Sequence, residues 1–122
     1  MSLNILIVED DRPLAITLTK GLQNAFSENI CVDVCFSGVQ ALSLLSQKTY
    51  DLVLSDFQMS GISGLELLNR IRQYQPKAFL ILMTAYGTDE LEKKARQLVD
   101  TYLTKPFDLP HLTKLFKKLF SV

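Results

Sequence analysis

The residues best suited to chemistry in this chain are acidic, hydroxyl and amino side chains that directly follow short apolar runs. Each of these runs has the composition of a buried β-strand. In chain order, the polar residues concerned are Glu9, Asp10, Asp11, Asp56, Thr84 and Lys105. If the runs are neighbouring parallel strands, their carboxyl ends bring all of these residues to one edge of a sheet, which is where such sheets bind ligands.

Four carboxylates and one ammonium give this edge a local charge of about minus three, in a protein with a formal net charge of zero. Clustered like charges are unfavourable unless a cation relieves them, and a few oxygen ligands with room for water favour Mg²⁺.

A carboxylate can also act as a nucleophile and form an aspartyl phosphate. A metal ion, an ammonium such as Lys105 and a hydroxyl such as Thr84 would then neutralise the phosphoryl oxygens. Asp56 is the best nucleophile candidate because it ends the predicted central strand. The only histidine, His111, is far from this edge, so the phosphoryl donor must come from outside the domain.

The elements that position these residues alternate along the chain. Apolar residues recur at helical spacing between and after the strands, and Asp108 with Pro110 marks the start of the last helix as N-cap and first-turn residue. The predicted strands are Asn4–Val8, Ile30–Phe36, Leu52–Ser55, Phe79–Met83 and Thr101–Leu103. The second alternates apolar and other residues, which suits an edge strand. The sequence therefore predicts an α/β, flavodoxin-like (βα)5 three-layer sandwich with a parallel sheet of strand order 2-1-3-4-5.

Composition narrows the class of protein further. A chain of 122 residues, 48% hydrophobic and 21% charged, is expected to form one globular domain over residues 1–122. Zero net charge argues against direct nucleic-acid binding, and no apolar run is long enough to span a membrane. Cys31 and Cys35 lie about 13 Å apart if they share a strand, too far for a disulfide, so we expect free thiols and a cytoplasmic protein.

The sequence resembles the receiver domain of bacterial two-component response regulators over essentially its whole length. The resemblance rests on four motifs in the expected order: the triplet Glu9-Asp10-Asp11, Asp56 followed by Met59 and Gly64, Thr84-Ala85, and Tyr102 three residues before Lys105-Pro106-Phe107. One acidic pair alone is a weak signal and fits a helix N-terminus equally well. Four motifs, each at the end of a predicted strand, together make a specific signal.

The resemblance implies a phosphorylation-dependent signalling switch of a phosphorelay. Asp56 would accept a phosphoryl group from the phosphohistidine of a sensor histidine kinase or a histidine phosphotransfer protein. Mg²⁺ would be held by Asp56, by Asp10 or Glu9 together with Asp11, and by the backbone carbonyl of Gln58, with Asp11 the leading candidate for a direct ligand. Such a domain is not a metabolic enzyme, because it catalyses only its own phosphorylation and dephosphorylation.

The resemblance also assigns the residues that pass on the signal. Thr84 would hydrogen-bond the phosphoryl group, and Lys105 would pair with it. Tyr102 would move between outward and inward positions with Thr84, although an ordinary half-buried tyrosine explains this residue nearly as well. The change would reach the face formed by the fourth helix, fifth strand and fifth helix, where a downstream output domain, another protein or a second copy of the chain would bind. The Lys105-Pro106 bond would be cis.

Two positions would set the lifetime of the phosphoryl group, Gln58 and Tyr86. A bulky Tyr86 restricts attacking water, which predicts slow self-hydrolysis. Two other classes of function remain as alternatives. One is a receiver-like interaction module that works without phosphorylation. The other is a Mg²⁺-dependent phosphohydrolase with an aspartyl-phosphate intermediate, which is disfavoured because Gln58 stands where that class has a second aspartate.

Overall fold

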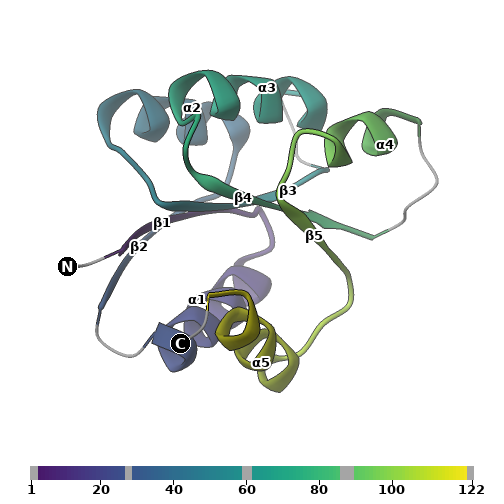
Figure 1. The fold of residues 1–122 in the computed structure, drawn as a ribbon. Coiled ribbons are helices and arrows are strands. Elements are labelled where there is room, and N and C mark those ends of the chain that lie inside the picture. Colours follow the sequence, from purple (N-terminus) through teal and green to yellow (C-terminus); the bar gives the residue numbers. More distant parts are fainter. Residues whose placement is uncertain (1–2, 27–28, 59–61, 86–89, 121–122) are drawn as a thin grey trace.

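A computed structural model describes residues 3–26, 29–58, 62–85 and 90–120. Strands and helices alternate along the chain, and the five strands form one parallel sheet in the order β2-β1-β3-β4-β5 (Figure 1). The elements are β1 (Leu3–Val8), α1 (Arg12–Phe26), β2 (Ile30–Cys35), α2 (Gly38–Gln47), β3 (Leu52–Asp56), α3 (Gly64–Tyr74), β4 (Phe79–Thr84), α4 (Glu90–Arg96), β5 (Thr101–Thr104) and α5 (Leu109–Phe120). The predicted fold class and strand order are confirmed.

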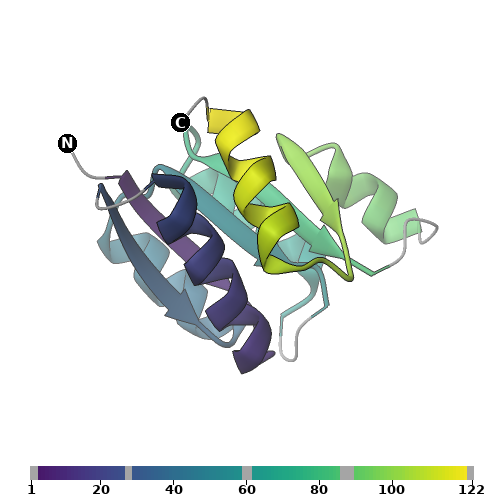
Figure 2. The same cartoon turned by 90° about the horizontal axis from the view of Figure 1, so that it is seen from below.

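The helices form a layer on each side of the sheet. Helices α1 and α5 cover one face, and α2, α3 and α4 cover the other (Figures 1 and 2). Strand β1 is buried on both faces: Leu6 and Val8 belong to the core under α2 and α3, whereas Ile5 and Ile7 belong to the core under α1 and α5. This two-sided burial explains why residues 5–8 of β1 form a continuous apolar run.

Strand β2 lies at the edge of the sheet and pairs only with β1, as its alternating sequence predicts. The side chains of Val32 and Val34 pack toward α1, and Cys35 packs toward the opposite layer. Both cysteines are free thiols, Cys31 exposed and Cys35 buried. Burial raises the pKa of the Cys35 thiol to about 12, so it stays protonated.

Side-chain caps fix where several helices begin. The Asp108 carboxylate accepts a hydrogen bond from the N–H of His111 at 2.9 Å, which confirms the predicted N-cap of α5. Ser37 and Ser63 cap α2 and α3 in the same way. The Lys105–Pro106 bond that leads toward α5 is cis, as expected.

Polar residues collect at the carboxyl edge of this otherwise apolar sheet. Glu9, Asp56 and Thr84 are among the few buried polar or charged residues. They follow or end β1, β3 and β4, which are adjacent in the sheet. Within the described residues, none of the helices is long and apolar enough to cross a membrane.

Candidate functional site

The predicted site residues reach one edge of the sheet because each belongs to the end of a neighbouring strand. Asp56 and Thr84 are the last residues of β3 and β4, one position further into the strand than the sequence predicts. Glu9 directly follows β1, and Lys105 directly follows β5. The Lys105 N–H donates to the Thr84 carbonyl oxygen at 2.8 Å, which continues the pairing of β4 with β5 and fixes where the lysine side chain starts.

The Lys105 ammonium bridges two buried carboxylates. Its Nζ lies 3.0 Å from Oε1 of Glu9 and 3.1 Å from Oδ2 of Asp56. The carboxylates are withdrawn from solvent, with Glu9 0% and Asp56 6% exposed. The sequence predicts that Lys105 pairs with a phosphoryl group at Asp56, but it gives no sign of the ion pair with Glu9. That contact depends on how the ends of β1 and β5 lie relative to β3.

Burial dominates the protonation of this cluster. It raises the pKa of Glu9 to about 7, although the hydrogen bonds from Lys105 and from the Asp11 N–H act in the opposite direction. Burial would lower the pKa of the Lys105 ammonium. The hydrogen bond to Glu9 and the negative charges of Asp56 and Glu9 outweigh burial, so the pKa of Lys105 is raised. Burial therefore keeps part of the Glu9 population protonated near pH 7, and among the described residues Lys105 is the cation paired with Glu9 and Asp56.

Three carboxylates are arranged to share a cation. One oxygen each from Glu9, Asp10 and Asp56 lies within 4.8 Å of the others. An all-oxygen set of this kind, with Asp10 exposed to solvent, suits a hard ion that keeps some of its water, such as Mg²⁺. The backbone of Gln58 borders the same group, because its N–H donates to Oδ1 of Asp56 at 3.2 Å.

Asp11 is not part of this carboxylate group. Its Oδ1 accepts a hydrogen bond from the N–H of Leu14 at 3.1 Å, which makes it the N-cap of α1. Its own N–H donates to Oε2 of Glu9 at 3.1 Å. The sequence carries a signal for this role, because Pro13 belongs in the first turn of a helix and Asp11 stands just before that turn.

The predicted switch residues lie on the two neighbouring strands β4 and β5. Thr84 is buried, whereas Tyr102 is 47% exposed and therefore in an outward position. The guanidinium carbon of Arg96, at the end of α4, lies 4.9 Å from the centroid of the Tyr102 ring. The tyrosine thus connects β5 to α4 at the surface. Tyr86, predicted to affect the phosphoryl lifetime, and Met59 lie outside the described residues.

Comparison with known proteins agrees with this arrangement. Residues 5–117 match the family of response regulator receiver domains. The chain is 39% identical over 116 residues to the response regulator protein FleR of Pseudomonas aeruginosa, covering 94% of this chain and 24% of FleR. It is 31% identical over 119 residues to sporulation initiation phosphotransferase F of Bacillus subtilis, covering 97% of this chain and 94% of that protein.

A solved structure supports the same relationship. The response regulator protein TrrA of Thermotoga maritima, in complex with Mg²⁺-BeF, is 34% identical to this chain with a TM-score of 0.79. The match covers 98% of this chain and 100% of TrrA. The chain therefore belongs to the response regulator receiver domain family, whose members act as signalling switches in two-component systems.

Proposed function

We propose that Asp56 accepts a phosphoryl group from the phosphohistidine of a sensor histidine kinase or a histidine phosphotransfer protein. The observation that carries this proposal is the position of the Asp56 carboxylate. It lies at the end of β3, within hydrogen-bond distance of the Lys105 ammonium and close to the carboxylates of Glu9 and Asp10. Such phosphodonors act in the cytoplasm, where the free thiols of this chain also fit.

The transfer itself is a displacement at phosphorus. A carboxylate oxygen of Asp56 forms the new P–O bond while the P–N bond to the donor histidine breaks, and the histidine takes up a proton as it leaves. The Lys105 ammonium lies 3.1 Å from Oδ2 of Asp56, so it would donate hydrogen bonds to the oxygens of a phosphoryl group on Asp56. The Thr84 hydroxyl, at the end of the adjacent strand, is the proposed hydrogen-bond donor to the same group.

The metal ligands that fit this geometry are Glu9, Asp10 and Asp56, together with the backbone carbonyl of Gln58. We favour Asp10 over Asp11 because Asp11 already caps α1. When bound, Mg²⁺ would neutralise charge on the phosphoryl oxygens and on the carboxylate cluster. In the part of the chain that the structure describes, Lys105 is the cation that pairs with Glu9 and Asp56.

The proposed output is a change in the surface formed by α4, β5 and α5. Movement of Thr84 toward a phosphoryl group would vacate space near β5 and draw Tyr102 inward, away from Arg96. A downstream output domain, a separate protein or a second copy of the chain would then recognise the altered face. The chain spans 24% of the length of FleR, one of the relatives it matches.

Intact mass spectrometry after incubation with Mg²⁺ and acetyl phosphate tests the acceptor. The parent protein should gain the mass of one phosphoryl group, and Asp56→Asn should gain none. Asp51→Asn is the matched control because Asp51 lies at the opposite end of β3, where it accepts from the Asn4 N–H. Phosphorylation of Asp56→Asn, or no phosphorylation of the parent, would contradict the proposal and favour an interaction module that works without phosphorylation.

A further inference from the structure

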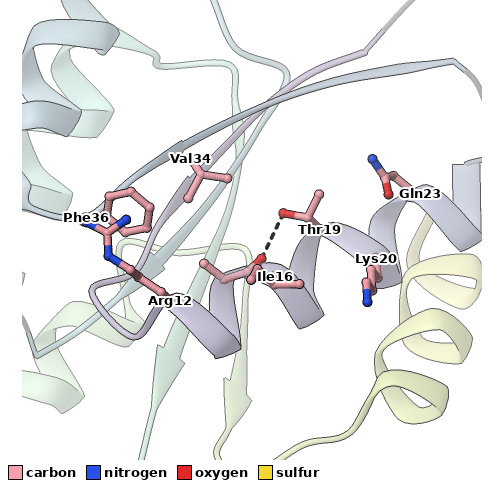
Figure 3. Close-up of a pocket in the computed structure, with 8 residues that line it drawn as sticks. Arg12, Ile16, Thr19, Lys20, Gln23, Val34 and Phe36 are labelled. Carbon is pink, nitrogen blue, oxygen red and sulfur yellow. Dashed lines mark hydrogen bonds between the residues drawn. The ribbon is translucent and has the colours of Figure 1, made fainter.

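A groove lies between helix α1 and the edge strand β2, and none of the residues that line it belongs to the carboxylate site. It has a volume of about 380 Å³, and its floor is apolar, with Ile16 from α1 and Val34 and Phe36 from the β2 side (Figure 3). Ile16 is 56% exposed, although it is a large apolar residue. The groove is also separate from the surface where α1 packs on α5 through Gly21.

Two cations from α1 line the groove. Arg12 stands at one end and Lys20 lies two turns further along the helix, before Gln23, and α1 contains no acidic residue (Figure 3). In the part of the chain that the structure describes, neither cation forms an ion pair with a carboxylate. The guanidinium carbon of Arg12 lies 3.9 Å from the centroid of the Phe36 ring, which holds the arginine in place and leaves its in-plane N–H groups able to donate.

The spacing along the groove matches an extended chain. Arg12, Ile16 and Lys20 follow one another at four-residue intervals, which is about 6 Å per step along a helix. In an extended strand, side chains on one face recur every two residues, or about 6.6 Å. A strand with acidic residues at positions i and i+4 and an apolar residue at i+2 can therefore contact all three residues in order.

The open edge of β2 offers the backbone partner that such a strand needs. The carbonyl oxygens of Asn29 and Cys35 accept from the N–H groups of Leu3, in β1, and of Glu9, directly after β1. Because alternate residues of a strand face opposite neighbours, the backbone groups of Val32 and Val34 point away from β1, toward the free edge. An added strand would pair there and place its side chains against α1.

We propose that the groove binds an extended acidic segment of a partner protein, which adds as a strand beside β2. Its pattern is acidic, any, apolar, any, acidic, with carboxylates on Arg12 and Lys20 and the apolar side chain on Ile16. An acidic segment fits because its carboxylates complement the charges of Arg12 and Lys20. Main-chain hydrogen bonds to the free edge of β2 would add to the affinity. The proposal uses none of the residues assigned to phosphorylation, so it stands independently of that function.

Amide chemical shifts of the ¹⁵N-labelled full chain, titrated with a seven-residue peptide, test this binding. The peptide is acetylated and amidated, with glutamate at positions two and six, leucine at position four and serine elsewhere. The expected shifts concentrate at Ile16, Lys20 and Val34. Lys20→Glu should weaken binding at least about fivefold, because it replaces an attraction by a repulsion. Lys77→Glu, an equal charge change at an exposed site outside the groove, should bind as the parent does.

Two altered peptides test the geometry. Moving the second glutamate to position five puts the two carboxylates on opposite faces of a strand, and N-methylation of the three central residues removes backbone donors. Each change should weaken binding at least about fivefold. Undiminished binding by Lys20→Glu, or by either altered peptide, would overturn the proposal. So would the same shifts on concentrating the protein alone, which would identify a second copy as the occupant. Equal shifts with phosphatidylglycerol vesicles in place of the peptide would assign the groove to a membrane surface instead.

Discussion

Lys105 and Glu9 are 96 residues apart in the chain, yet the lysine Nζ lies 3.0 Å from Oε1 of the glutamate. The same ammonium lies 3.1 Å from Oδ2 of Asp56. This ion pair joins the ends of β1 and β5 across the strands between them, and it places a single cation between the two buried acids. The behaviour of the site depends on that balance of charge.

Removing the ammonium should destabilise the protein. Lys105→Met leaves Glu9 and Asp56 buried without their cation, and we expect the free energy of unfolding at pH 8 to fall by about 2 kcal/mol in the absence of Mg²⁺. The loss is below that of a fully buried pair because the lysine side chain is 23% exposed. Urea denaturation measures it, with the exposed Lys118→Met as control. If adding Mg²⁺ does not stabilise Lys105→Met at all, the proposed metal site is wrong.

Glu9 should make stability decrease as the pH rises. Its pKa is raised from 4.5 in the unfolded chain to about 7 in the folded protein, so the folded state binds more protons than the unfolded state between these values. The contribution of Glu9 is therefore fully present below pH 4.5 and lost as the pH rises through 7. Unfolding measured from pH 5 to pH 8 without metal should show this decline in the parent and a smaller decline in Glu9→Gln. Parallel curves for the two proteins would contradict the raised pKa.

Gly64 should be intolerant of a side chain. A Cβ at this position would overlap with the carbonyl oxygen of Phe57, the residue after Asp56, and would lie 2.8 Å from Cδ1 of its ring. Gly64→Ala should lower the free energy of unfolding by about 1–3 kcal/mol, even though alanine is the better helix former. The free energy of unfolding, measured by urea denaturation, and the rate of phosphorylation by acetyl phosphate should both be lower than in the parent. A more stable Gly64→Ala protein would show that the backbone near Asp56 relaxes without strain.

Tyr102 should become less exposed on phosphorylation. It is 47% exposed and packs against Arg96 in this structure, so an inward movement changes its surroundings strongly. Fluorine NMR of protein labelled with 3-fluorotyrosine should show a Tyr102 resonance that moves when acetyl phosphate and Mg²⁺ are added. Tyr102→Phe assigns that resonance by its loss. An unmoved Tyr102 signal in protein that mass spectrometry shows to be phosphorylated would rule out the switch role.

Tyr86 should slow hydrolysis of the phosphoryl group. We expect a bulky aromatic residue two positions after Thr84 to restrict the approach of water, so Tyr86→Ala should shorten the lifetime of phosphorylated Asp56 several-fold. The decay is followed by intact mass after removal of the phosphodonor, with the exposed Tyr74→Ala as control. An unchanged decay rate in Tyr86→Ala would show that access of water is controlled elsewhere.

The sequence by itself determined the architecture and the edge where the site forms. Strands buried on both faces, such as β1 and β4, contain long apolar runs because the side chains on both faces enter the core, whereas the alternation in β2 is typical of an edge strand. The polar residues after those runs are then forced to one edge of the sheet by the parallel order of the strands. The N-cap role of Asp108 is also predicted from local sequence, because Pro110 follows it in the first turn of the last helix.

Only the tertiary structure decided which of the acidic residues do what. Glu9 and Asp10 are adjacent and chemically similar, so the pattern of the sequence leaves open which of them meets Lys105; for Asp11, Pro13 in the first turn of the helix indicates the N-cap. The start of α1 separates them: Asp11 caps the helix, whereas Glu9 turns inward to Lys105 and Asp10 stays at the carboxylate group with Asp56. The raised pKa of Glu9 likewise follows from burial among distant segments. Distances across strands that are far apart in the chain are set by packing, and no local pattern of residues contains them.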